Sequence, residues 1–136
     1  MPSRAEAIAA RARELIGAPF RLQGRSTGGV DCIGVVVHAL GLRSDAVPRD
    51  YSLRGGNLRE IGAAFGALGL RACRQDAKAP GDVLVFRPGP EQVHLGISTG
   101  ECFVHADAGL GRVVERPFPA PWPVLARWRA DDSGSF

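Results

Sequence analysis

Hydrophobic and polar residues alternate with a helical period over two stretches in the first half of the chain. The first stretch opens with a capping box formed by Ser3 and Glu6, and it ends at Gly17 and Pro19. The other covers residues 57–68, where apolar residues recur every three or four positions. We therefore predict a helix in each stretch.

The segment between these two stretches is apolar on nearly every side. After Asp31 it reads Cys-Ile-Gly-Val-Val-Val-His-Ala-Leu, and it stops at Gly41. This pattern indicates an element buried inside the domain, and Asp31 is a favourable N-cap for a helix that begins at Cys32. The run of valines also fits a strand, so the helical interpretation rests partly on the resemblance given below. The glycine-rich residues 23–30 before it are predicted to form a loop.

The second half of the chain shows the alternation typical of strands. We predict strands over residues 82–86, 93–98, 101–105, 112–115 and 125–128, with turn signals at Pro80-Gly81 and Thr99-Gly100. Phe118 and Trp122 lie in a proline-rich stretch and predict packing rather than a linker. Helices followed by an antiparallel sheet predict a single α+β domain over residues 1–136, with a frayed tail over 131–136.

Composition excludes several classes of function. The net charge is +3, but no run of Lys and Arg occurs, so we do not expect nucleic acid as a partner. Arginine makes up nearly all of the 17 basic residues, which suits an anionic substrate, although a GC-rich genome gives the same bias. The three cysteines show neither a disulfide framework nor zinc spacing, so no metal or cofactor is implied.

The sequence has no apolar signal core and no stretch long enough to span a bilayer. We expect a soluble protein that is made in the cytoplasm, does not insert into membranes and leaves the cell, if at all, by another route.

Cys32 is the first candidate for chemistry. A cysteine at a helix N-terminus lies beside unpaired N–H groups and a partial positive charge, which favour thiolate over thiol. The same N–H groups can stabilise an oxyanion. The alternative is a buried structural cysteine, and this site alone does not decide between the two.

Two histidines on one predicted hairpin supply a candidate base. If Thr99-Gly100 is a two-residue turn, His94 faces His105, with Cβ atoms about 4.5–5.5 Å apart on one face. The other face then carries Leu95, Ile97, Cys102 and Val104, which supports the register. Nucleophile, base and orienting group are then Cys32, His94 and His105, unless the two histidines oppose each other by chance on a structural face.

The remaining candidates of these types are set aside. His38 lies six residues after Cys32 and points away from it on a helix, so we interpret it as a core or rim residue. Cys102 falls on the apolar face of the hairpin, and Cys73 is predicted to lie in a connecting loop. Neither is expected to be the nucleophile.

These motifs together resemble the NlpC-type cell-wall cysteine peptidases, a papain-related family. The resemblance rests on Gly17-Ala-Pro-Phe-Arg-Leu-Gln-Gly24 with Gly29-Val-Asp-Cys-Ile-Gly34, and then on Pro80-Gly-Asp-Val-Leu-Val-Phe86, Val93-His-Leu-Gly-Ile97 and Phe103-Val-His105. It covers roughly residues 5–115 and implies a papain-like fold. The wording Arg-Leu-Gln-Gly-Arg-Ser, the short chain and the missing signal resemble a branch found in phage tails and gene-transfer agents.

Two residues depart from the family pattern. Ile33 stands where the family usually has Ser, and Phe20 stands where it usually has a Tyr whose hydroxyl lies near the oxyanion. Loss of that hydroxyl costs on the order of 2.7–4 kcal/mol of transition-state stabilisation if nothing replaces it. Gln23, Ser26 and Tyr51 are candidate replacements, and Asp31 and Phe20 join them as candidates for contacts to substrate or oxyanion.

By resemblance, the expected function is cleavage of peptidoglycan stem peptides at the bond between γ-D-glutamate and the diamino acid. Tail proteins of a phage or gene-transfer agent are the expected macromolecular partners, and a phage-like particle is the expected route to the cell wall. One alternative is a weakly active or inactive tail-tip structural protein. The other is a thiol amidase or acyltransferase on the same fold.

Overall fold

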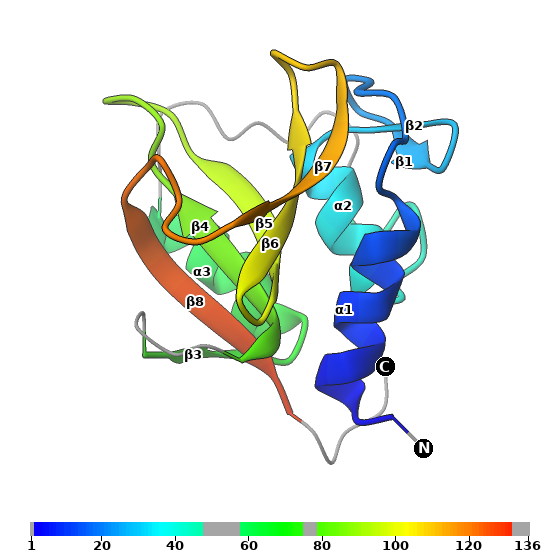
Figure 1. Ribbon diagram of the computed structural model, residues 1–136. Coiled ribbons are helices and arrows are strands. Elements are labelled where there is room, and N and C mark those ends of the chain that lie inside the picture. Colours follow the sequence, from blue (N-terminus) through cyan, green and yellow to red (C-terminus); the bar gives the residue numbers. More distant parts are fainter. Residues whose placement is uncertain (1, 48–57, 75–78, 132–136) are drawn as a thin grey trace.

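A six-stranded antiparallel sheet forms the centre of the computed structural model, which describes residues 2–47, 58–74 and 79–131 (Figure 1). The order of the strands across the sheet is β3-β8-β4-β5-β6-β7. Their bounds are β3 Leu70–Cys73, β4 Pro80–Phe86, β5 His94–Thr99, β6 Cys102–Asp107, β7 Arg112–Pro117 and β8 Val124–Ala130. The predicted α+β class with an antiparallel sheet is confirmed.

In the described residues three helices precede all six of these strands, namely α1 Arg4–Glu14, α2 Cys32–Ala39 and α3 Leu58–Ala67. The hydroxyl of Ser3 accepts a hydrogen bond from the Glu6 N–H, as the capping box predicts. Helix α1 packs on β4 and β5, while α2 packs on α1 and β5. The segment that could also have been a strand is therefore a helix. No helix in the described part of the chain combines the length and apolar character needed to cross a bilayer.

The two faces of the sheet bury different kinds of core. Aliphatic side chains such as Val85, Leu95 and Ile97 point to the helices and join the main core. The other face carries a smaller aromatic core in which Phe86 and Phe103 are fully buried. Phe118 and Trp122 pack against this second core, so the proline-rich stretch is part of the fold, as predicted.

The register of the predicted histidine hairpin is wrong by two residues. Ser98 pairs with Phe103 and Ile97 with Val104, so the turn consists of Gly100 and Glu101 instead of Thr99 and Gly100. Gly100 has φ +106°, a conformation that suits glycine at the first position of a two-residue hairpin turn. In this register, Gly96 and not His94 lies opposite His105.

Two loop predictions also need correction. The glycine-rich segment contains a short antiparallel ribbon, β1 Arg25–Ser26 paired with β2 Gly29–Val30. Cys73 closes strand β3 and pairs with Arg127 of β8, so it does not lie in a loop. Strand β3 escaped prediction because only Leu70 among its four residues is buried, which leaves little alternation to detect.

Candidate active site

A cleft of about 670 Å³ opens where the start of α2 meets the start of β5 and the end of β6. Cys32, His94 and His105 all line it, although they come from three different elements. The segment before α2 and the loop before β5 form further parts of its wall, including Phe20, Gln23 and Gln92. The structure thus brings the three predicted catalytic side chains to one cavity.

Asp31 fixes the position of Cys32 through two backbone hydrogen bonds. One carboxylate oxygen accepts the N–H of Gly34 at 2.9 Å and so caps α2, as predicted. The other accepts the N–H of Gln23, also at 2.9 Å. Gln23 has φ +63°, a left-handed conformation that is unusual for a residue with a side chain. Asp31 therefore joins the segment before the β1–β2 ribbon to the helix that presents Cys32.

The Cys32 thiol is neutral in this structure. Burial raises the pKa of Cys32 to about 12, and the negative charge of Asp31 raises it further, whereas backbone N–H groups of Leu95, Cys32 and Ile33 lower it. The expected effect of the helix N-terminus is thus present, because two of these N–H groups belong to the start of α2. Desolvation is nevertheless the larger effect, so the N–H groups of the helix reduce the pKa of Cys32 without making thiolate the main form.

His94 and His105 form a hydrogen-bonded pair despite the shifted register. Nε2 of His94 lies 2.9 Å from Nδ1 of His105. His94 lies diagonally across from His105 on the same face of the sheet, within reach of long side chains. Gly96 lies directly opposite His105, and a Cβ there would come within 3.5 Å of the Cβ of His105 and 3.2 Å of the Phe86 ring. The absence of that side chain leaves the imidazole room to reach His94.

Both imidazoles are held in their neutral form. Burial lowers the pKa of His94 to about 4, His105 lowers it further, and Asp107 opposes the shift. Burial likewise lowers the pKa of His105 to about 4, again opposed by Asp107. The cause is the aromatic core, because Trp122 contacts both rings edge-on, with centroids 5.3 and 5.4 Å away.

The free nitrogen atoms define what the pair can do. With Nε2 of His94 engaged, its Nδ1 has no hydrogen-bond partner among the described residues and is the atom left to take a proton. If Nδ1 takes the proton, then Nε2 carries a hydrogen that it donates to Nδ1 of His105. His105 then orients the ring and selects its tautomer. The arrangement has the parts of an activated cysteine, except that both partners are uncharged at rest.

The structure distributes the other candidate residues unevenly. Phe20, Gln23 and Asp31 line the cleft, but Ser26 does not, and its hydroxyl accepts the N–H of Gly28 instead. Tyr51 lies outside the described residues. Within the described ranges, no group of three or more His, Cys, Asp and Glu side chains is arranged to hold a metal ion.

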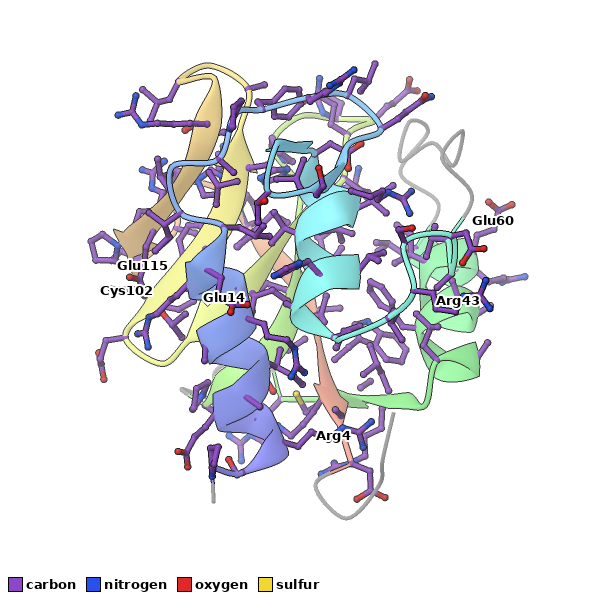
Figure 2. All side chains as sticks on the ribbon, turned by 90° about the vertical axis from the view of Figure 1, so that its right-hand side faces the viewer. Arg4, Glu14, Arg43, Glu60, Cys102 and Glu115 are labelled. Atoms are coloured by element: carbon purple, nitrogen blue, oxygen red, sulfur yellow. The ribbon has the colours of Figure 1, made fainter. Side chains whose placement is uncertain are left out.

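The residues set aside as non-catalytic do lie away from the cleft. His38 lies near the end of α2, where its Nε2 is 3.2 Å from a carboxylate oxygen of Glu14 at the end of α1. Cys102 lies near the turn of the β5–β6 hairpin, on the side of Glu115 and far from the start of α2 (Figure 2). Cys73 lies beside the buried carboxylate of Asp82.

Sequence reasoning missed two residues at the site. Asp107 lines the cleft and acts on both imidazoles, and its position two residues after His105 on a strand was a sufficient signal. Trp122 was expected to pack, but nothing in the sequence placed it against the histidines. The arginines also do not serve as expected: in the described part of the chain none lines the cleft.

Comparison with solved structures identifies the fold. No protein-family model matches the chain, and a search of curated proteins found no match. NlpC1 from Trichomonas vaginalis aligns over 96% of this chain with a TM-score of 0.66 and 23% identity, although the chain spans only 45% of its length. The peptidoglycan hydrolase RipB from Mycobacterium tuberculosis aligns over 93% of this chain and 63% of its own, with a TM-score of 0.57 and 22% identity.

A further similar structure is RipD from Mycobacterium tuberculosis, described as a non-catalytic NlpC/p60 domain protein adapted to bind peptidoglycan. It aligns over 95% of this chain and 98% of its own, with a TM-score of 0.57 and 19% identity. At these identities the likeness establishes a shared fold. The chain therefore has the fold of NlpC/P60 domains, which include both a hydrolase and a non-catalytic protein.

Proposed function

We propose that this chain is an NlpC-type cysteine peptidase that hydrolyses amide bonds in peptidoglycan stem peptides, at the bond between γ-D-glutamate and the diamino acid. The observation that carries the proposal is that the Cys32 thiol and the His94–His105 pair open onto one cleft. The fold shared with RipB, a peptidoglycan hydrolase, supports the substrate class.

The reaction assigns one role to each group. The sulfur of Cys32 attacks the amide carbonyl while Nδ1 of His94 takes the thiol proton, and backbone N–H groups at the start of α2 stabilise the oxyanion. His94 then gives the proton to the leaving amine, and the carbonyl stays on sulfur as a thioester. Water hydrolyses the thioester with His94 as base, which restores the thiol.

The pKa values determine when the proton moves. Because the pKa of Cys32 is raised to about 12 and that of His94 lowered to about 4, a thiolate–imidazolium pair is not the resting state. Proton transfer therefore accompanies attack on the carbonyl instead of preceding it. The Cys32 thiol and the His94 imidazole thus both stay neutral until the substrate carbonyl is in place.

A second candidate function is peptidoglycan binding without catalysis. The observations that favour it are the raised pKa of Cys32 and the position of Phe20, which lines the cleft without the hydroxyl that the family usually has there. RipD provides a precedent for this fold. A thiol amidase or acyltransferase is a related alternative: an amidase cuts another amide bond, and an acyltransferase passes the acyl group of the thioester to an acceptor other than water.

We further propose delivery to the cell wall as part of a phage-like particle, with tail proteins as partners. The support is the loop sequence Arg21-Leu-Gln-Gly-Arg-Ser26, which resembles the phage-tail and gene-transfer-agent branch. Co-purification with an assembled tail, compared with free protein, tests this assignment.

Mass spectrometry of defined muropeptides tests the peptidase. Wild type is expected to release products cut between γ-D-glutamate and the diamino acid, and Cys32→Ala to release none. Cys102→Ala is the matched control, because that thiol lies outside the cleft, and it should retain wild-type activity. Cleavage by Cys32→Ala contradicts the mechanism, whereas binding of muropeptides without cleavage by wild type establishes the second candidate.

A further inference from the structure

One nitrogen atom at the active site has no role in the proposed reaction, namely Nε2 of His105. His105 is 1% exposed, and this nitrogen is buried with no hydrogen-bond partner among the described residues. The other ring nitrogen, Nδ1, is engaged with Nε2 of His94 at 2.9 Å. A buried N–H group without a partner costs free energy. The surroundings of Nε2 therefore decide whether it carries a hydrogen.

The two neutral imidazoles can distribute their hydrogens in two ways. In the first arrangement, Nε2 of His94 donates to Nδ1 of His105, so Nε2 of His105 carries a hydrogen and Nδ1 of His94 has a free lone pair. In the second, Nδ1 of His105 donates to Nε2 of His94, so Nε2 of His105 is bare and Nδ1 of His94 already holds a hydrogen. Only the first arrangement provides a base for the Cys32 thiol.

Aromatic rings surround His105 on this face of the sheet. The centroid of Trp122 lies 5.4 Å from that of His105 at an interplanar angle of 79°, and Phe103 lies 5.3 Å away at 38°. The steep angle to Trp122 is typical of an edge-to-face contact, in which hydrogens at the edge of one ring point at the face of the other. The face of an aromatic ring is negative, so it attracts an N–H hydrogen and repels the lone pair of a bare nitrogen.

Other contacts fix the position of the Trp122 ring. Its centroid lies 5.4 Å from that of Phe86 and 5.3 Å from that of His94, and the guanidinium carbon of Arg116 lies 5.7 Å from it, over the ring. The residue belongs to the proline-rich segment between β7 and β8, which packs on the aromatic core. The indole is thus held against the histidine pair at the wall of the cleft.

We propose that Trp122 is a positioning residue: the face of its indole accepts the N–H of His105 Nε2 and so selects the arrangement in which His94 is a base. An N–H contact to an aromatic face is weak, but here it favours one of two states that differ only in where their hydrogens lie. It also provides a partner for a nitrogen that has no hydrogen bond to the described residues. The catalytic consequence rests on the proposed function, whereas the position of the hydrogen does not.

Nuclear magnetic resonance of the isotope-labelled chain tests the assignment. At neutral pH both rings are uncharged, and nitrogen–proton correlation spectra distinguish a ring nitrogen that carries a hydrogen from a bare one. We expect hydrogens on Nε2 of His94 and on Nε2 of His105, the latter shifted upfield by the ring current of the indole. His38 does not line the cleft and serves as an internal reference. A hydrogen on Nδ1 of His105 in wild type overturns the proposal.

Three variants separate the indole face from the bulk of the side chain. Trp122→Leu keeps an apolar side chain without a ring face, so it should populate both arrangements and lower kcat about twofold to fivefold, the range of one weak hydrogen bond. Trp122→Phe restores a ring face and should return both the His105 hydrogen and kcat toward wild type. Phe118→Leu is the matched control, because Phe118 lies in the same segment and contacts the ring of Phe103. It should change neither the hydrogens nor kcat.

The outcomes distinguish this inference from the proposed function. If both hydrogens stay on Nε2 in Trp122→Leu, the indole does not select the arrangement, and the proposal is overturned even where kcat falls. A change confined to KM shows instead that Trp122 contacts the substrate, and it overturns the proposal as well. If wild type cleaves no muropeptide, the peptidase function fails, but the spectra still decide the role of Trp122. If Trp122→Leu does not fold, the wild-type position and upfield shift of the His105 hydrogen remain the test.

Discussion

Two buried polar clusters lie at opposite ends of the β4–β5 pair, and they differ in how completely their polar atoms are hydrogen-bonded. At the start of β4, Asp82 is 1% exposed and accepts four hydrogen bonds of 2.8–3.1 Å from Arg127 and Arg129. At the start of β5, His94 and His105 share one hydrogen bond of 2.9 Å. There Nε2 of His105 is buried without a partner among the described residues.

Burial therefore has a different effect on charge in the two clusters. In the Asp82 cluster each side chain has a partner of opposite charge, and hydrogen bonds from Arg129 to Asp82 raise the pKa of Arg129 still further above its ordinary value. In the histidine cluster no carboxylate of the described residues hydrogen-bonds to the rings, and burial outweighs the opposing charge of Asp107, so the rings lose their charge. The four hydrogen bonds to Asp82 use both of its carboxylate oxygens, and we call this cluster saturated. In the histidine cluster Nδ1 of His94 makes no hydrogen bond to the described residues and is available for proton transfer.

Removing the base is expected to have the largest effect. His94→Ala should eliminate turnover of muropeptides, because in the proposed mechanism His94 is the base that takes the thiol proton. His105→Asn should keep a measurable fraction, since Asn can still accept the hydrogen bond from His94, and His105→Ala should keep less. Initial rates from chromatography of muropeptides provide the measurement. If His105→Asn and His105→Ala are equally active, His105 does not act by orienting His94.

Breaking the saturated cluster should cost stability. Asp82→Ala leaves Arg127, which is 3% exposed, as a buried charge without its partner, and the expected loss is about 3–5 kcal/mol in the free energy of unfolding. The exposed Arg43–Asp45 pair offers a control, and Asp45→Ala should change that free energy by less than about 1 kcal/mol. Urea denaturation gives both values. If both variants change the free energy of unfolding by similarly small amounts, the hydrogen bonds to Asp82 do not contribute to stability.

The neutral cluster should reveal itself in the pH dependence of stability. The pKa of His94 and of His105 is 6.5 in the unfolded chain and about 4 in the folded chain. Between these two values the unfolded chain binds more protons than the folded chain, so stability falls as pH drops from 6.5 to about 4. The pKa of Cys32 rises from 9.0 to about 12, so stability falls again as pH rises above 9. Each group contributes at most about 1.4 kcal/mol per pH unit.

Urea midpoints from pH 4.5 to 10.5 measure this profile. In Cys32→Ser, the free energy of unfolding should fall less above pH 9 than it does in wild type, because the thiol is gone. In Cys102→Ser it should fall as much as in wild type. An unchanged alkaline decline in Cys32→Ser would mean that the thiol titrates normally.

Restoring the missing hydroxyl is expected to have the smallest effect. Phe20→Tyr adds a donor to the lining of the cleft, and kcat should stay the same or rise by at most about tenfold, because in the proposed mechanism the backbone N–H groups of α2 already stabilise the oxyanion. Steady-state kinetics on the same muropeptides provide the comparison. A large loss of activity would show that Phe20 is needed for packing at the site.

Local signals in the sequence were enough to predict the elements but not their exact pairing. The capping by Ser3 and Asp31 could be predicted because each acts within three residues. The hairpin register failed because Thr99-Gly100 and Gly100-Glu101 are both acceptable turns, and only the pairing of Ser98 with Phe103 decides between them. The two histidines were still predicted to meet, because a shift of two residues keeps both on one face.

Properties that depend on surroundings could not be predicted. The neutral state of Cys32 follows from burial, which outweighs the opposing hydrogen bond from the backbone of Leu95, a residue far away in the sequence. The contacts of Trp122 with the histidines depend on how the segment after β7 folds back over the sheet.

The contact between Cys32 and the backbone of Leu95 has a consequence for the order of assembly. The histidines are 11 residues apart and meet when a single hairpin closes, an event of local contacts. The thiol is delivered only when α2 docks on β5, across more than sixty residues of chain, and such long-range contacts form slowly. A partly folded chain in which only the hairpin has closed therefore holds the proton acceptor without its nucleophile. On the proposed function, such a chain cannot attack the peptides around it until the whole domain has folded.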